Sequence, residues 1–145
     1  MEKLVYLISK DRGVSGDVLR EGLIKRVVPV LRGAGAQNVS LNVDDAAVEA
    51  GEGVRISKGE PPIRVMVSFW MESADDRESC ENVLAKESET LAGYLVAESR
   101  PLIHDPVPGG RSPGANLVTR IHKRPDISDE EFNLLWTIEH RKVAI

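Results

Sequence analysis

Strand-like and helix-like segments alternate over residues 1–103 in an order that few folds accommodate. Runs rich in Val, Ile, Leu and aromatic residues predict strands, whereas apolar residues at intervals of three and four predict helices. The four predicted strands are Lys3–Ser9, Gln37–Val43, Ile63–Met71 and Tyr94–Ile103. One helix is predicted after the first strand and another after the third, so the order of elements is βαββαβ.

Both predicted helices have recognisable ends. Ser15 is a good N-cap for the first helix, and Pro29 predicts a kink in it, because proline lacks the amide hydrogen and crowds the preceding turn. Asp75 and Asp76 favour the start of the second helix, which we expect to end at Gly93. The apolar stripe of the first helix is Val18, Leu19, Gly22, Leu23, Val27, Val30 and Leu31.

This order favours an α+β fold, a four-stranded antiparallel sheet with both helices on one face, known as the ferredoxin-like plait. The run Ile63–Met71 is the most apolar in the chain and is expected to be a central strand. Its Phe69 and Trp70 would be core aromatics or would line a cavity. Because this strand is too apolar to face water on either side, we expect two such sheets to pair through their uncovered faces.

Composition excludes several classes of function. The chain has 145 residues, a net charge of −4 and a single cysteine, so neither nucleic-acid binding nor a disulfide is expected. No apolar run approaches the roughly 20 residues needed to cross a membrane, and we find no signal peptide. Three widely spaced histidines give no metal-site pattern. We therefore expect a soluble cytoplasmic protein that has no metal, cofactor, nucleic-acid or membrane partner.

A segment rich in Pro and Gly divides the chain after its first plait. The predicted organisation is a domain over residues 1–104, a linker over residues 105–114 and a second, shorter unit over residues 115–145. In that unit, Asn116–His122 predicts another strand and Ser128 caps an amphipathic helix.

The second unit repeats the beginning of the first. Shifted by 113 positions, Leu4–Leu31 aligns without a gap with Leu117–Ala144, and six positions are identical. Ser15 meets Ser128 in this alignment, so the helix cap falls in the same register. We interpret this as a duplication in which residues 115–145 begin a second plait. A lone strand–helix unit cannot bury its apolar stripe, so either a longer tandem chain or another surface would complete it.

The sequence IHKRPDISDEEFNLLWTIEHRKVA, with Phe132, Trp136 and His140 at four-residue intervals, resembles the opening of an EthD-type domain. The segment GYLVAESRPL, from Gly93 to Leu102, is similar to the fourth strand of that family. The resemblance implies a dimeric α/β barrel, in which two plaits pair sheet to sheet as a homodimer or within one tandem chain. It also implies a link to the breakdown of small organic compounds. The first half departs from this motif, with Leu19, Leu23 and Val27 at the equivalent positions.

The candidate site residues lie in the second unit. His140 would act as a catalytic acid or base, or as a hydrogen-bonded structural histidine. Period-two alternation places Arg120 and His122 on the barrel side of their predicted strand, where they would bind an anionic or enolic substrate, unless Arg120 pairs with an acid. Trp136 and Phe132 would complete the substrate site. The predicted function is binding or conversion of a small apolar or aromatic compound, and the alternative is a non-catalytic ligand-binding or structural barrel.

Overall fold

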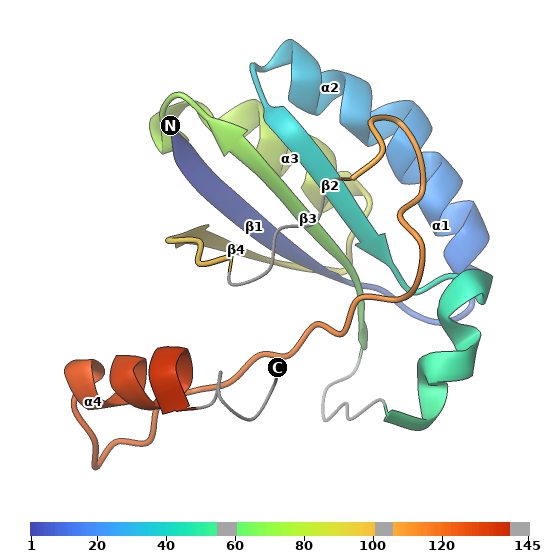
Figure 1. Cartoon of the computed structure of the whole chain (residues 1–145). Coiled ribbons are helices and arrows are strands. Elements are labelled where there is room, and N and C mark those ends of the chain that lie inside the picture. Colours follow the sequence, from blue (N-terminus) through green and yellow to red (C-terminus); the bar gives the residue numbers. More distant parts are fainter. Residues whose placement is uncertain (55–60, 101–105, 140–145) are drawn as a thin grey trace.

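The computed structural model describes residues 1–54, 61–100 and 106–139 of the chain. Four strands form one antiparallel sheet in the order β2-β3-β1-β4, and the helices that follow β1 and β3 cover one of its faces (Figure 1). This arrangement confirms the predicted α+β, ferredoxin-like plait. The strands are β1 (Glu2–Ser9), β2 (Gln37–Val43), β3 (Ile63–Met71) and β4 (Thr90–Val96).

The first helical segment is continuous but changes its winding halfway. The helix α1 (Gly16–Gly22) passes into the π-helical turn η1 (Leu23–Val27) and then into α2 (Val28–Gly33). The Oγ of Ser15 accepts a hydrogen bond of 3.3 Å from the backbone N–H of Val18, as expected for an N-cap. The disruption predicted from Pro29 therefore takes the form of a wider turn, placed just before the proline ring.

The second helical segment is shorter than predicted. A 3₁₀ turn, η3 (Ala74–Asp76), precedes α3 (Glu78–Lys86), and the prediction that this helix continues to Gly93 is wrong. Gly93 instead lies inside β4 opposite Tyr6, whose Cε1 atom is 2.6 Å from the position that a Cβ atom would take. Glycine serves here to admit the aromatic ring of a neighbouring strand and does not end a helix.

The hydrophobic core lies between the sheet and the helices. Alternate residues of β1 and β3 face inward, and the apolar stripe of α1, η1 and α2 packs against them. Tyr6 stacks on Phe69 with ring centroids 5.7 Å apart. Cys80 is buried in this core, and burial raises the pKa of its thiol. The core residues include Leu4, Tyr6, Ile8, Leu19, Leu23, Val27, Leu31, Val65, Val67, Phe69, Met71, Cys80 and Leu84.

A buried arginine holds the loops at one end of the sheet. Arg64 donates from Nε to Asp44 Oδ2 at 2.9 Å, and from Nη1 to the carbonyl oxygens of Asp11 and Val14, each at 3.1 Å. The connection after β2 then forms the 3₁₀ helix η2 (Ala46–Val54). The guanidinium group of Arg64 therefore has a structural role, and it ties the β1–α1 loop to the end of β2.

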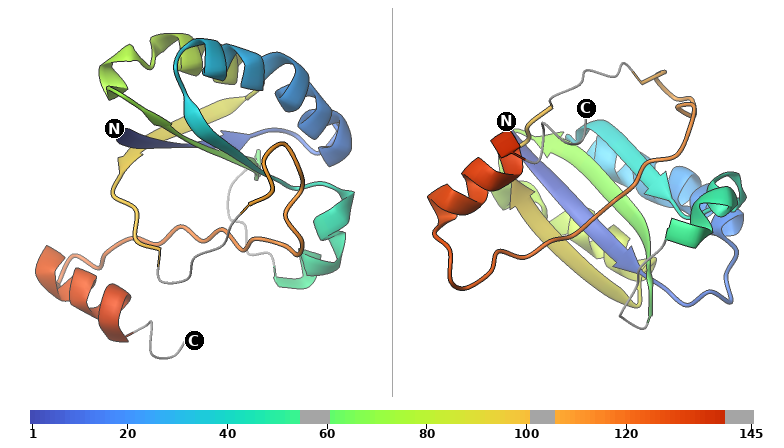
Figure 2. Two further views of the ribbon diagram at one scale, coloured as in Figure 1. Left: turned by 45° about the horizontal axis from the view of Figure 1, so that its top comes forward. Right: turned by 60° about the horizontal axis from the view of Figure 1, so that its bottom comes forward.

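Residues 106–128 cross the molecule and lead to a separate helical segment (Figure 2). This segment is α4 (Asp129–Leu134), continued by the π-helical turn η4 (Leu135–Glu139) (Figure 2). The prediction of a strand at Asn116–His122 is wrong, because residues 115–124 pair with no strand in the described structure. Their side chains are exposed, to 74% for Leu117. A strand is stable only when a neighbour satisfies its backbone hydrogen bonds, and the described part of the chain offers this segment none.

Candidate functional site

The face of the sheet that points away from the helices, called here the helix-free face, is mostly apolar over β1, β3 and β4, with Ser68 in the middle of β3 and Lys3 at one end of β1. It carries the side chains that alternate with the core residues of each strand. Leu7 is only 7% exposed, yet it does not belong to the helix-side core. Ser40 and Asn42 give the face a polar edge on β2. Its apolar residues are Val5, Leu7, Met66, Trp70, Ala92 and Val96.

One end of the helix-free face carries a cation over an aromatic ring. Lys3 and Trp70 are register partners of neighbouring strands, and the Lys3 Nζ lies 5.6 Å from the centroid of the Trp70 ring. The same ammonium group pairs with Glu98, which follows β4. The Lys3 side chain is 14% exposed. This end of the face therefore has a positive charge that a carboxylate already balances.

The segment of residues 106–128, which we call the arm, runs across the helix-free face toward α4 (Figure 2). Near its start, Arg111 pairs with Asp45. The Nδ2 of Asn116 donates to the Oδ1 of Asn42 on β2 at 3.0 Å. Farther along, the Nη1 of Arg120 lies 3.5 Å from the hydroxyl oxygen of Tyr94 on β4. The arm thus passes from the β2 edge of the sheet to the β4 edge.

Asp45 is the most strongly held anchor of the arm. Its side chain is 1% exposed and accepts hydrogen bonds from Arg111, from Arg20 Nη1 at 2.8 Å and from the Ala47 N–H at 3.1 Å. Burial by itself raises the pKa of Asp45. The hydrogen bonds from Arg111 and Arg20 outweigh that effect, and the pKa lies below its ordinary value. Asp45 is therefore a charged anchor that joins α1, the η2 connection and the arm.

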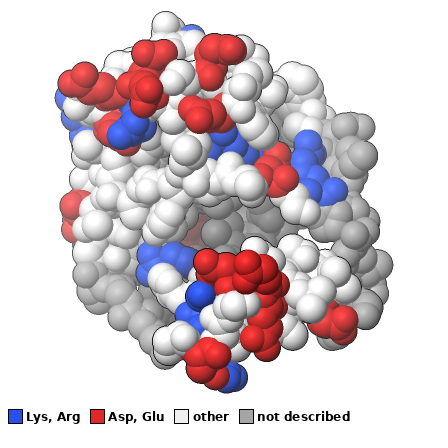
Figure 3. Space-filling view, turned by 90° about the vertical axis from the view of Figure 1, so that its left-hand side faces the viewer, with Lys and Arg blue, Asp and Glu red and all other residues white. Residues whose placement is uncertain are grey.

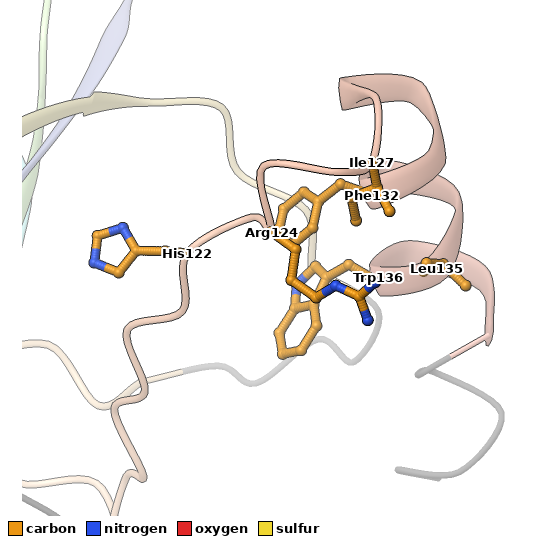
Figure 4. A pocket seen from close by; sticks show the side chains of 6 residues that line it. All are labelled: His122, Arg124, Ile127, Phe132, Leu135 and Trp136. Carbon is orange, nitrogen blue, oxygen red and sulfur yellow. The ribbon is translucent and has the colours of Figure 1, made fainter.

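A concavity of about 320 Å³ lies between the arm and α4 (Figure 4). Phe132 and Trp136 project from the helical segment toward the arm, and the His122 ring stands apart from them on the arm itself. Figure 3 shows that the surface is hollowed between the sheet and α4, and that acidic side chains gather over α4. The first turn of α4 has three acidic residues in succession, Asp129, Glu130 and Glu131. The concavity is lined by His122, Arg124, Ile127, Phe132, Leu135 and Trp136.

The charge of the arginine beside this concavity is balanced locally. Arg124 donates from Nε to Asp126 Oδ1 at 2.9 Å, and its Nη2 contacts Oδ2 of the same carboxylate. These bonds hold the pKa of Asp126 below its ordinary value. The lining therefore combines two aromatic rings with an imidazole and a neutralised ion pair, which suits an aromatic compound better than a strongly charged one.

The structure brings together three of the five predicted site residues. Phe132, Trp136 and His122 line the concavity, whereas Arg120 contacts Tyr94 on the sheet. His140, the predicted acid or base, lies outside the described residues.

The two helical units begin in the same way. Ser128 Oγ accepts a hydrogen bond of 3.0 Å from Glu131 N–H, just as Ser15 caps α1, and each short α-helix passes into a π-helical turn. The two helical units differ in how far their apolar faces are buried. Leu19 and Leu23 are at most 2% exposed, whereas Trp136, which aligns with Leu23, is 44% exposed. An apolar helical face that is covered in the first unit is thus open in the second.

Sequence reasoning missed Tyr94 as a candidate site residue. The prediction placed it at the start of its strand, whereas the structure places it in the middle of β4, facing the arm. Period-two alternation within β4 would have put Tyr94 on the opposite face from Leu91, which packs on the core. That signal required the correct start of the strand, which the sequence did not supply.

Searches for related proteins identify no family. No protein-family model matches the chain, and no curated protein matches it in sequence. Among residues 1–54, 61–100 and 106–139, no cluster of three or more His, Cys, Asp or Glu is placed to hold a metal ion. Within the same described ranges, no helix is long and apolar enough to span a membrane.

Proposed function

We propose that the protein binds a small apolar or aromatic organic compound in a cavity formed when two plaits pair through their helix-free faces. The observation that carries this proposal is the helix-free face itself. It presents Val5, Leu7, Met66 and Trp70 where a sheet covered on both sides would have a second layer. Leu7 is buried and the other three are half-buried, so the arm leaves the face only partly covered (Figure 2). A partly exposed apolar face of this kind marks an interaction or ligand site.

The pairing would make this a dimeric α/β barrel of the EthD type. The spacing of Phe132, Trp136 and His140 and the resemblance of Gly93–Leu102 to the fourth strand of that family support this assignment. The shared cap and π-helical turn of the two helical units support the view that residues 115–145 begin a second plait. In the barrel the second plait would come from the duplicated unit or from another copy of the chain.

The role of His140 as an acid or base belongs to the same proposal. The alternative is a barrel that binds a ligand or has a structural role without catalysing a reaction. One observation favours this alternative for the first half: Leu19, Leu23 and Val27 occupy the positions equivalent to Phe132, Trp136 and His140, and all three are buried in the core. No imidazole could act from that part of the first plait.

Self-association and ligand binding test the proposal together. Sedimentation equilibrium of the chain should give twice the monomer mass, and calorimetric titration with 2-naphthamide, a neutral aromatic probe, should show saturable binding. Val5→Glu places a charge in the centre of the helix-free face and should abolish both results. Val18→Glu is the matched control, because Val18 is 62% exposed on α1 and should leave both unchanged.

The two variants should retain the far-ultraviolet circular dichroism of the unmodified chain. A folded chain that stays monomeric and does not bind 2-naphthamide would contradict the proposal. So would a Val5→Glu variant that still forms the dimer and binds the probe.

A further inference from the structure

Arg120 of the arm contacts the helix-free face at Tyr94, and no carboxylate among the described residues pairs with its guanidinium group. Within the described residues, its only hydrogen bond goes to the hydroxyl oxygen of Tyr94, at 3.5 Å. A guanidinium group has five N–H donors, so most of them remain available at this position. Arg124 and Arg111, by contrast, each pair with an aspartate.

Tyr94 places this arginine against a defined part of the sheet. The residue opposite Tyr94 on β1 is Val5, and Ala92 and Val96 lie two residues away on the same side of β4. Residues two apart on a strand are about 6.8 Å from each other, which is close to the width of one aromatic ring. The side chain of Tyr94 itself lies between Ala92 and Val96, so the apolar surface available to a planar ring system is the strip beside the tyrosine ring, formed by Val5 and Val96.

The charged groups around this surface indicate which ligand charge would fit there. Lys3 also borders this strip, because its register partner on β4 is Val96, but its ammonium group pairs with Glu98. Arg120 consequently contributes the one unbalanced positive charge of the group formed by Lys3, Glu98 and Arg120. A monoanion matches that charge, whereas a phosphate or sulfate ester dianion would bring excess negative charge onto an apolar strip.

The planar shape of the guanidinium group further restricts the chemical class of the ligand. It is planar and matches a carboxylate with two parallel hydrogen bonds, and a phenol hydroxyl beside it supplies a third donor. We propose that Arg120 and Tyr94 form a binding site for a planar aromatic monocarboxylate, whose ring packs beside the Tyr94 ring against Val5 and Val96. This inference rests on the proposed function, because the strip is part of the helix-free face.

Calorimetric titrations with two isosteric probes test the inference. The first is 2-naphthoate, a carboxylate, and the second is 2-naphthamide, which has the same ring system without the charge. The unmodified chain should bind 2-naphthoate at least about tenfold more tightly, because a hydrogen bond to a charged group is stronger than one to a neutral group. Arg120→Gln should remove this preference and leave the affinity for 2-naphthamide unchanged.

Three further variants separate charge from geometry. Arg120→Lys keeps the charge but loses the planar pair of donors, and should retain only part of the preference. Tyr94→Phe should reduce the preference by a smaller factor than Arg120→Gln, because it removes one donor and no charge. Arg32→Gln is the control, because Arg32 is exposed on α2, on the helix side of the sheet, and its replacement changes the net charge equally.

The outcomes distinguish the two proposals. Equal affinities of the unmodified chain for both probes, or a preference that survives in Arg120→Gln, would overturn the carboxylate site while leaving ligand binding on the helix-free face intact. A chain that binds neither probe would overturn both proposals. A preference lost equally in Arg32→Gln would show that net charge, and not this site, attracts the carboxylate.

Discussion

Tyr6 shows how a single side chain connects three parts of the plait. Its ring lies on Gly93 of β4 and stacks on Phe69 of β3, and its hydroxyl donates to Glu81 Oε1 of α3 at 3.0 Å. Burial, together with the bond to Glu81, raises the pKa of the phenol, so Tyr6 stays neutral over the working pH range. The fit of this ring depends on the absence of a side chain at residue 93.

Gly93→Ala should therefore lower the free energy of unfolding by about 1–3 kcal/mol, because the new methyl group meets a rigid ring and the strand must shift. Gly33→Ala is the matched control, since a Cβ atom at that helical position meets no atom within 4 Å, and it should be neutral or slightly stabilising. Urea denaturation followed by circular dichroism measures both changes. Equal stability of the two variants would contradict the close packing of Tyr6 on β4.

At the scale of elements, two helical segments with the same cap differ in their packing. α1 carries buried residues, whereas α4 and η4 bury none of their described side chains. A cap stabilises the whole fold only when the helix that it begins is packed on the rest of the molecule. The Ser15 and Ser128 hydroxyl groups therefore stabilise the protein to different extents.

Ser15→Ala should lower the free energy of unfolding of the sheet by about 1 kcal/mol, as is usual for the loss of an N-cap hydrogen bond. Ser128→Ala should leave the unfolding midpoint unchanged and reduce only the helical signal at low temperature. Thermal denaturation at low protein concentration, followed at both a helix and a strand wavelength, gives the comparison. Equal losses in the two variants would show that α4 is packed when the sheet unfolds.

At the scale of the whole molecule, Asp45 is the point where the plait holds the arm. Because its pKa is lower in the folded chain, its ionised form contributes stability above the ordinary aspartate pKa of about 3.9. That contribution is lost as the pH falls through the folded pKa. Acid should therefore loosen the attachment of both Arg20 and Arg111.

Asp45→Asn should lower the free energy of unfolding at pH 7 by about 1–3 kcal/mol, because Arg20 and Arg111 lose their charged acceptor. The difference between this variant and the unmodified chain should shrink as the pH falls below about 4. Denaturant titrations at pH 7, 5, 4 and 3 measure it. Glu49→Gln, at an exposed position of η2, is the control, and a difference that stays constant with pH would contradict the assignment.

The sequence by itself determined the plait. Local alternation gave the bounds of β2, and the most apolar run of the chain gave those of β3. Ser15 marked the start of α1, and the order of elements left one compact topology with short connections. The four-residue spacing of Phe132 and Trp136 also identified two lining residues of the concavity. Each of these features is determined by residues that are close together in the sequence. A pattern of a few positions is therefore enough to predict it.

Only the tertiary structure decided those features that depend on contacts between residues far apart in the sequence. β4 begins at Thr90 because Gly93 must lie beside the Tyr6 ring, and no local pattern distinguishes that glycine from one that ends a helix. Residues 116–122 have strand-like alternation but form no strand, because backbone hydrogen bonds require a neighbouring strand. The approach of Arg120 to Tyr94 likewise exists only because the arm crosses the sheet and brings together residues that are far apart in the sequence.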